Sequence, residues 1–160
     1  MGKQLSKKVQ YNTLDLENNI VFALQDKKAQ DIVELDMSEL GISLFDRFII
    51  CTATSTTHAG AMLDNVLMTV KKNLGLYPKQ TEGVANAQWI LIDYFDVIVH
   101  IFLKESRSFY HIEGLWKDAK RIEYNELIEL NVMESLKVEK IKTKRSTFIK
   151  KETKINSDGK

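Results

Sequence analysis

Two runs of mostly apolar residues follow one another near the middle of the chain, at residues 89–94 and 96–103. Side chains alternate between the two faces of a β-strand, so the first run places Trp89, Leu91 and Asp93 on one face. Both runs are rich in β-branched and aromatic residues and are apolar on nearly both faces, which is typical of inner strands covered by helices. The pattern predicts a β-hairpin at the centre of a sheet.

The turn of this hairpin contains an unexpected residue. Asp93 and Asp96 flank Tyr94 and Phe95, and the simplest prediction is a two-residue turn. Such turns usually contain Gly or Asn, because at least one position needs a positive φ. Either the turn is longer than two residues, or Phe95 adopts a strained backbone because its ring is needed at the surface.

Hydrophobic periodicity predicts helices and strands on both sides of the hairpin. Residues 15–28 have helical spacing, residues 31–37 alternate like a half-exposed strand, and residues 46–53 form a more apolar strand. Capping residues at 55–57 begin a helix that ends near Gly75, and Gly83 closes a third strand at 79–84. Short helical turns are expected at 104–110 and 113–119, and a last helix at 123–136.

This order of elements predicts an α/β fold with a mixed sheet, in which helices cover an antiparallel central hairpin. The hairpin must be antiparallel, whereas the helix after residues 46–53 allows a parallel crossover. The large apolar residues of segment 104–119 either cover the sheet or rim a surface patch, and core positions are the default expectation for them: Phe109, Tyr110, Leu115 and Trp116.

Length and charge divide the chain into three parts. The 160 residues, 44% of them hydrophobic, suffice for one domain at 15–136, between a flexible basic N-terminus at 1–14 and a Lys-rich, disordered tail at 137–160. Residues 15–134 contain eleven Lys and Arg against nineteen Asp and Glu, a net charge of −8, whereas the tail has a net charge of +6. The acidic body suits a basic protein partner, and the tail is either merely solvated or also touches RNA.

Cys51 is the one cysteine, so no disulfide forms within the chain, and its apolar surroundings favour a buried thiol over a nucleophile. No apolar run reaches the roughly 18 residues of a membrane span, and the first eleven residues lack the apolar segment of a signal peptide. We therefore expect a cytoplasmic protein without membrane contact. Its expected oligomeric state is a monomer or a weak dimer.

Signals of catalysis are weak. The phosphate-binding patterns GxGxxG and GxxxxGK[ST] are absent, and no cofactor is expected. His100 and His111 are isolated and are taken as structural residues, so no metal is expected, while His58 is taken as a surface residue without a role. Asp93 and Asp96 alone suit Mg²⁺, and a metal-dependent nucleotidyltransferase stays open as an alternative.

The same acidic residues make better sense in a recognition surface. Trp89 and Tyr94 place aromatic contact area next to the negative charge of Asp93 and Asp96, which is the composition of a protein interface aimed at Arg and Lys. An RNA-binding module acting through the basic tail is the second alternative.

Several motifs in the same region resemble a known family. The segments FDRFIICTATSTTHAGAMLDNV and WILIDYFDVIVHIFLKESRSFYHIEGLW, the latter followed by Lys117, Asp118 and Ala119, contain W-x-L-x-D-Y, D-V-x-V-H, R-x-F-Y and L-W-x-D-A. This combination resembles the ribosomal silencing factor S family, also called Iojap, over residues 15–119. Members usually have Gly at the position of Phe95, and the Lys-rich extension beyond about Asn131 is expected to lie outside the family pattern.

The resemblance implies a bacterial cytosolic protein that binds the large ribosomal subunit through its fourteenth large-subunit protein. Bound there, it would block joining of the small subunit and repress translation when nutrients are short; organellar relatives are linked to large-subunit assembly. The implied fold is related to nucleotidyltransferases without their catalytic signature. The resemblance implies that the family's interface residues correspond to the motif positions Trp89, Leu91, Asp93, Tyr94, Asp96 and His100, with Tyr110 and Trp116 as weaker candidates.

Overall fold

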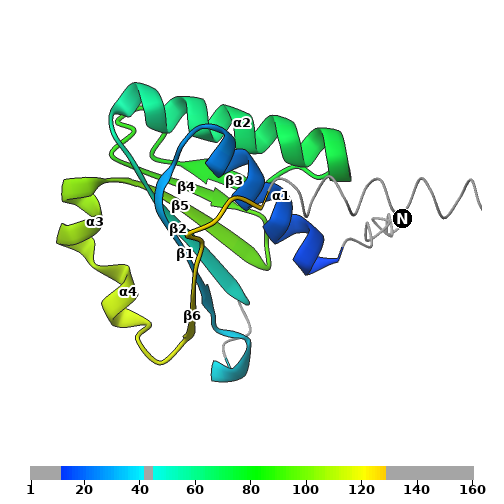
Figure 1. Cartoon of the computed structure of the whole chain (residues 1–160), viewed down its shortest axis with the longest axis vertical. Helices are drawn as coiled ribbons and strands as arrows, with labels where there is room; N and C mark the ends of the chain where they lie inside the picture. The colour runs from blue at the N-terminus through cyan, green and yellow to red at the C-terminus, as the bar shows by residue number, and fades with distance from the viewer. Residues whose placement is uncertain (1–11, 42–44, 129–160) are drawn as a thin grey trace, which may run out of the picture. The chain divides into compact units, whose positions relative to one another are not determined.

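The computed structural model describes residues 12–41 and 45–128, and the elements appear in the expected order (Figure 1). The expected helices at 15–28 and 55–75 and the strands at 31–37, 46–53, 79–84 and 89–103 are all present. Their bounds are α1 Thr13–Asp26, β1 Gln30–Asp36, the 3₁₀ turn η1 Ser38–Leu40, β2 Arg47–Ala53, α2 Thr56–Leu74, β3 Gln80–Glu82, β4 Trp89–Asp93, β5 Val97–Leu103, α3 Lys104–Tyr110, α4 Ile112–Leu115 and β6 Lys120–Glu123.

The strands form one six-stranded sheet in the order β3-β4-β5-β2-β1-β6. β2 and β5 pair in parallel, with Phe48 opposite Ile98 and Ile50 opposite His100, while the other neighbours are antiparallel. The mixed α/β fold is therefore confirmed, including the parallel crossover through α2. Of the predicted central hairpin, β5 is an inner strand and β4 lies next to the edge strand β3.

Helix α2 begins and ends at the residues that the sequence indicates. The Ser55 side chain accepts a hydrogen bond from the backbone N–H of His58, and Gly75 ends the helix in the left-handed conformation at φ 66°. His58 is not without a role, contrary to expectation. Its Nδ1 accepts from the Thr54 backbone N–H at 2.9 Å and its Nε2 donates to the Lys27 carbonyl at 2.6 Å, which ties the end of α1 to the start of α2.

The two faces of the sheet are covered differently (Figure 1). Helices α1 and α2 pack together on the face that contains the alternate β5 residues Val97, Val99 and Ile101, all fully buried. The opposite face contains Ile98 and Phe102, which cluster with side chains from β1 and β2 and with Ile112, Ala119 and Trp116 of the later segment. Within the part of the chain that the structure describes, the elements that cover this second face are short.

The β4–β5 turn has two residues, and Phe95 adopts the strained backbone that was one of its two predicted outcomes. The two-residue turn consists of Phe95 and Asp96, one residue later than predicted, because Tyr94 N–H donates to the Val97 carbonyl at 2.9 Å. Phe95 has φ 71°, and the Asp96 N–H bonds back to the Tyr94 carbonyl, so Phe95 is the centre of a tight γ-turn. Its side chain is 55% exposed, so the strained backbone presents the ring to solvent.

The end of the described chain differs from expectation. A helix was predicted at 123–136, but Lys120–Glu123 is the edge strand β6, paired antiparallel with β1, and residues 124–128 are irregular. The period of apolar residues favoured a helix, whereas the open edge of β1 offers backbone partners that a local pattern does not reveal. The rest of that helix, most of the basic N-terminus and the Lys-rich tail lie outside the described residues.

A buried cluster of charged groups joins α1 to the sheet. Glu34 was expected on the exposed side of its strand, yet it is only 1% exposed, as is Glu17 of α1. Arg47 donates to Glu34 at 2.7 Å and to Glu17 at 3.0 Å, and the Tyr124 hydroxyl donates to the other Glu34 oxygen. The Arg47 guanidinium pairs with Glu34 and also donates to Glu17, whose pKa burial raises, so neither carboxyl group is left as an unpaired buried charge.

The Glu17 carboxyl should make stability depend on pH. Burial and then the neighbouring Glu34 raise the pKa of Glu17 to about 8. The folded state therefore holds a proton that the unfolded chain releases near pH 4.5, so the free energy of unfolding falls as pH rises toward 8. Glu17→Gln keeps hydrogen bonds but not the titration, and it should flatten this decline, which is at most about 1.4 kcal/mol per pH unit.

The measurement is urea unfolding between pH 6.5 and 8.5, with Glu39→Gln on the exposed η1 turn as the control. Parallel pH profiles for wild type and Glu17→Gln would contradict this assignment.

Phe95→Gly should stabilise the protein, because Gly adopts positive φ without the steric penalty of a Cβ. Phe95→Ala is the matched control, since it removes the exposed ring but keeps the Cβ. We expect the glycine variant to exceed the alanine variant by about 1 kcal/mol in the free energy of unfolding. Equal urea midpoints would show that the turn is not strained at this residue.

Candidate functional site

A cluster of mainly aromatic side chains lies on the sheet face opposite α1 and α2. It begins with the pairing of β4 and β5, which places Trp89 beside Phe102 and Leu91 beside His100. β2, next to β5, adds further rings, and α3 and the turn after α4 fold over the edge. We call this cluster the aromatic face, and it comprises Phe45, Phe48, Trp89, Leu91, His100, Phe102, Tyr110 and Trp116.

Trp89 connects the sheet to α3. Its ring stacks on Phe102 with centroids 4.9 Å apart and lies 4.7 Å from the ring of Tyr110. Its Nε1–H donates to Nδ1 of His100 at 3.0 Å. Gly83, at φ 74°, supports this strand from the β3–β4 turn, because a Cβ there would overlap the carbonyl oxygen of Trp89. Trp89 is half-buried, so part of the ring still faces solvent.

His100 lies beneath this surface and orients Trp89. Because Nδ1 accepts the indole N–H, the imidazole proton lies on Nε2, which is buried and has no hydrogen-bond partner among the described residues. The ring of Phe48 stands edge-on at 4.5 Å. Burial lowers the pKa of His100 to about 3, so the imidazole stays neutral and keeps its acceptor for Trp89.

The other half of the aromatic face is a three-ring contact. Phe45 stacks on Phe48 at 4.7 Å, and Trp116 meets both rings edge-on at 5.9 and 6.1 Å. These geometries are the favoured ones for aromatic pairs. Trp116 is thereby fixed against β2 while it remains partly exposed.

Beside the aromatic face, the α3–α4 segment presents large apolar side chains to solvent. Phe109 is 81% exposed, Leu115 75% and Tyr110 49%. Core positions were the default expectation for them, and that expectation is wrong for Phe109, Tyr110 and Leu115. Amphipathic spacing could not show this, because these helices are too short to bury a full face. Contiguous exposed apolar residues mark an interaction site more often than single ones do.

The structure does not bring all the sequence-predicted site residues to this surface. Tyr94 is only 2% exposed and lies on the α1–α2 face with Ile90 and Ile92, so it is a core residue there. His100 is 4% exposed and can act only through its neighbours. Trp89, Leu91, Tyr110 and Trp116 do share the aromatic face.

The acidic pair Asp93 and Asp96 lies at the hairpin tip. The Asp93 carboxylate accepts the backbone N–H of Phe95 at 2.8 Å, and the Asp96 carbonyl accepts the backbone N–H groups of Asp46 and Arg47. Both residues therefore take part in building the turn. Within the described ranges, no three His, Cys, Asp or Glu side chains are grouped so as to hold a metal ion.

Cys51 is the buried thiol that its surroundings indicate. It is fully buried, its Sγ lies 3.7 Å from the His100 carbonyl, and burial raises the pKa of the thiol to about 12. A thiol with so high a pKa is a poor nucleophile.

Comparison with known families identifies the chain. A family model described as "Ribosomal silencing factor during starvation" matches residues 10–156. The chain belongs to this family. Since the match extends through residue 156, the expectation that the segment beyond Asn131 lies outside the family pattern is wrong.

Individual relatives agree with this family. The chain is 41% identical over 109 residues to "Ribosomal silencing factor RsfS" of Halalkalibacterium halodurans, covering 68% of this chain and 91% of that protein. It is 31% identical to "Mitochondrial assembly of ribosomal large subunit protein 1" of Mus musculus, over 61% of this chain and 43% of that protein. A crystal structure of a Chromobacterium violaceum protein matches with TM-score 0.64 and 33% identity, covering 74% of this chain and 98% of that one.

Membership in the ribosomal silencing factor family points to a partner connected with the ribosome. Which residues make the contact is not tested by these likenesses, so the role of the aromatic face stays a prediction. No helix within the described ranges has the length and apolar character to cross a membrane.

His100 should prove to be a positioning residue for Trp89. His100→Gln retains an acceptor for the indole N–H. His100→Phe retains a ring but leaves that N–H unpaired, which should lower the free energy of unfolding by about 1 kcal/mol. We expect hydrogen exchange of the Trp89 indole N–H, followed by NMR, to accelerate in the phenylalanine variant and less in the glutamine variant. Equal exchange in both variants would contradict the assignment.

A pH profile adds a second readout. With a folded pKa of about 3, the unfolded chain takes up a proton at His100 before the folded state does. The free energy of unfolding of the wild type should therefore fall as pH drops from about 6.5 toward 3, and both variants should lose this component.

Proposed function

We propose that the protein binds the large ribosomal subunit through its fourteenth large-subunit protein and sterically blocks joining of the small subunit. In this way it represses translation in the cytoplasm under nutrient limitation, by occupancy and without turnover. The observation that carries the proposal is the aromatic face with its exposed rim, Phe109, Tyr110 and Leu115, in a chain of the ribosomal silencing factor family.

The chemistry of this surface supports a protein partner. Aromatic anchors that are rigidly held, as Trp89 is by His100 and Phe102, lose little conformational freedom on binding. Residues 15–134 have a net charge of −8, and ribosomal proteins are basic because they contact RNA. Complementary charge speeds the encounter more than it adds affinity.

A role in assembly of the large subunit is the second candidate. It is favoured by the likeness to the mouse protein whose name is "Mitochondrial assembly of ribosomal large subunit protein 1". Both roles need binding to the large subunit, and they differ in the stage at which binding occurs. A metal-dependent nucleotidyltransferase has less support, since the Asp93 carboxylate is bonded to the turn.

The decisive experiment is a subunit-joining assay. Purified small and large subunits are mixed at joining Mg²⁺ concentration with stoichiometric protein, and joined ribosomes are measured by sedimentation. We expect the joined fraction to fall without added nucleotide, and the protein to sediment with the large subunit. Unchanged joining at saturating protein would overturn the proposal. Binding to precursor particles alone would favour the assembly role.

The interface variant in this assay is Tyr110→Ala. Tyr110 is half exposed, so its removal should leave the fold intact, whereas Trp89→Ala would also disrupt three ring contacts. A central aromatic contact typically contributes ~2 kcal/mol, or roughly thirtyfold in affinity, and we expect a smaller loss for Tyr110 because it lies at the rim. The matched control is Leu14→Ala. Leu14 is exposed and belongs to α1, on the sheet face opposite the aromatic face, so this variant should bind like the wild type.

A further inference from the structure

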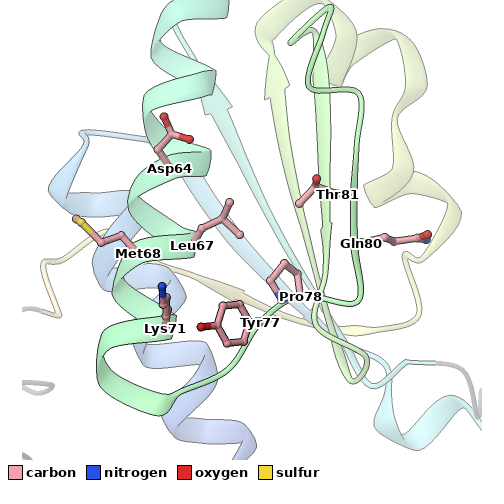
Figure 2. Close-up of a pocket in the computed structure, with 8 residues that line it drawn as sticks. All are labelled: Asp64, Leu67, Met68, Lys71, Tyr77, Pro78, Gln80 and Thr81. Carbon is pink, nitrogen blue, oxygen red and sulfur yellow. The ribbon is translucent and has the colours of Figure 1, made fainter.

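A second candidate surface lies on the other side of the sheet, away from the aromatic face. It is an open groove of about 610 Å³ between α2 and the edge strand β3, within the about 300–1,000 Å³ range of small-ligand sites. Figure 2 shows Leu67 of α2 and Thr81 of β3 on opposite sides of the groove, with Pro78 below them beside Tyr77. Lys71 and Tyr77 lie together at one end of it.

Lysines flank this end of the groove within an otherwise acidic body. Lys71 lines the groove, whereas Lys72 and Lys79 are the sequence neighbours of lining residues. Residues 65–81 contain three lysines, Lys71, Lys72 and Lys79, and no Asp or Glu. None of the three takes part in the ion pairs found among residues 12–41 and 45–128. Lys71 and Lys72 complement the negative end of the α2 dipole, but Lys79 follows the helix by five residues, so the dipole does not account for it.

An exposed aromatic ring accompanies these charges. Tyr77 is 65% exposed, and the Lys71 ammonium lies 5.5 Å from the centroid of its ring. Met68, one helical turn from Lys71, is 62% exposed. A surface cation–π contact alone would explain Lys71 and Tyr77, but not the apolar groove beside them or the unpaired Lys72 and Lys79.

The combination favours an unpaired nucleotide over other occupants. Single-stranded RNA is bound by aromatic rings that stack on bases, next to cations that follow the phosphates. An apolar peptide would fit the groove but would leave three lysines without a counter-charge. Asp64, two turns before Lys71 on α2, lines the opposite end of the groove and disfavours phosphate there. The phosphates would therefore lie at the end of the groove lined by Lys71, which Lys72 and Lys79 flank in the sequence.

We infer that this groove binds one unpaired ribonucleotide, with its base against Tyr77 and Pro78 and its phosphates near Lys71, Lys72 and Lys79. The surface lies on the α2 side of the sheet, so it remains free when the aromatic face is occupied. The inference rests on the proposed function only for the source of the RNA, which is the ribosomal RNA around the bound protein. It places an RNA contact in the folded body, in addition to any made by the tail.

The test uses the full-length chain and a fluorescein-labelled 12-nucleotide poly(A) RNA, with binding followed by anisotropy over a series of salt concentrations. Tyr77→Ala should weaken binding roughly 5- to 100-fold, the usual effect of losing one base–aromatic stack. Tyr77→Phe keeps the stacking surface and should stay near the wild type. All variants retain the tail, so its contribution is common to them.

The lysines have a matched control on the other helix. Lys71→Gln with Lys72→Gln should lower the slope of log affinity against log salt by about 0.7 per lost phosphate contact. Lys27→Gln with Lys28→Gln makes the same charge change at the end of α1 and should leave the slope closer to that of the wild type. Equal effects of the two pairs, or unchanged affinity of Tyr77→Ala, would overturn the inference.

The two proposals can fail separately. Tyr110→Ala should weaken large-subunit binding and leave binding of the 12-nucleotide RNA unchanged, whereas Tyr77→Ala should weaken RNA binding directly. If wild-type protein fails to block subunit joining while Tyr77→Ala still loses RNA affinity, the proposed function falls and the groove assignment stands.

Discussion

The parallel pairing of β2 with β5 is the constraint on which the rest of the structure depends. Parallel neighbours need a long crossover, and here the connection includes α2, which packs with α1 over one face of the sheet. Among residues 12–41 and 45–128, α3, α4 and the turn after them lie on the other face, and they are too short to cover it. The partly open aromatic face is therefore a consequence of the topology. An exposed apolar surface of this kind is unfavourable in a free protein unless a partner covers it for part of the time.

Much of the fold could be predicted because its signals are local. The alternation of apolar residues identified β4 and β5, and the capping residue Ser55 and the terminal Gly75 gave the bounds of α2. The positive φ of Phe95 was one of two predicted outcomes, since a two-residue turn without glycine must place a side chain there. The sequence predicted only some of the residues that share the aromatic face. Strand alternation grouped Trp89 with Leu91, but only the register with β5 brought His100 and Phe102 beside them.

Some of the errors concern partners that are distant in the sequence. Glu34 has the pattern of an exposed strand residue, and only Arg47 and Tyr124 make its burial favourable. No strand was predicted at 120–123, and the helix expected from Glu123 onward meets the structure at a residue that pairs with β1 as the end of β6. Tyr94 carries the family motif, but the alternation that exposes Trp89 turns Tyr94 into the α1–α2 core. Phe109 and Leu115 are apolar residues on the surface, because α3 and α4 are too short to bury a full apolar face.

Charge and apolar surface are distributed unevenly between the two faces of the sheet. The aromatic face is built from rings held by neutral contacts, including a histidine that burial keeps uncharged, so its shape should change little with salt. The groove between α2 and β3 instead combines the ring of Tyr77 with nearby lysines that have no acidic partner among the described residues. A protein that approaches a ribosome meets basic protein and phosphate side by side. An acidic body is attracted by the first and repelled by the second, so it needs a local basic site wherever RNA lies close. The lysines beside Tyr77 would allow the acidic body to lie against RNA without repulsion on that side.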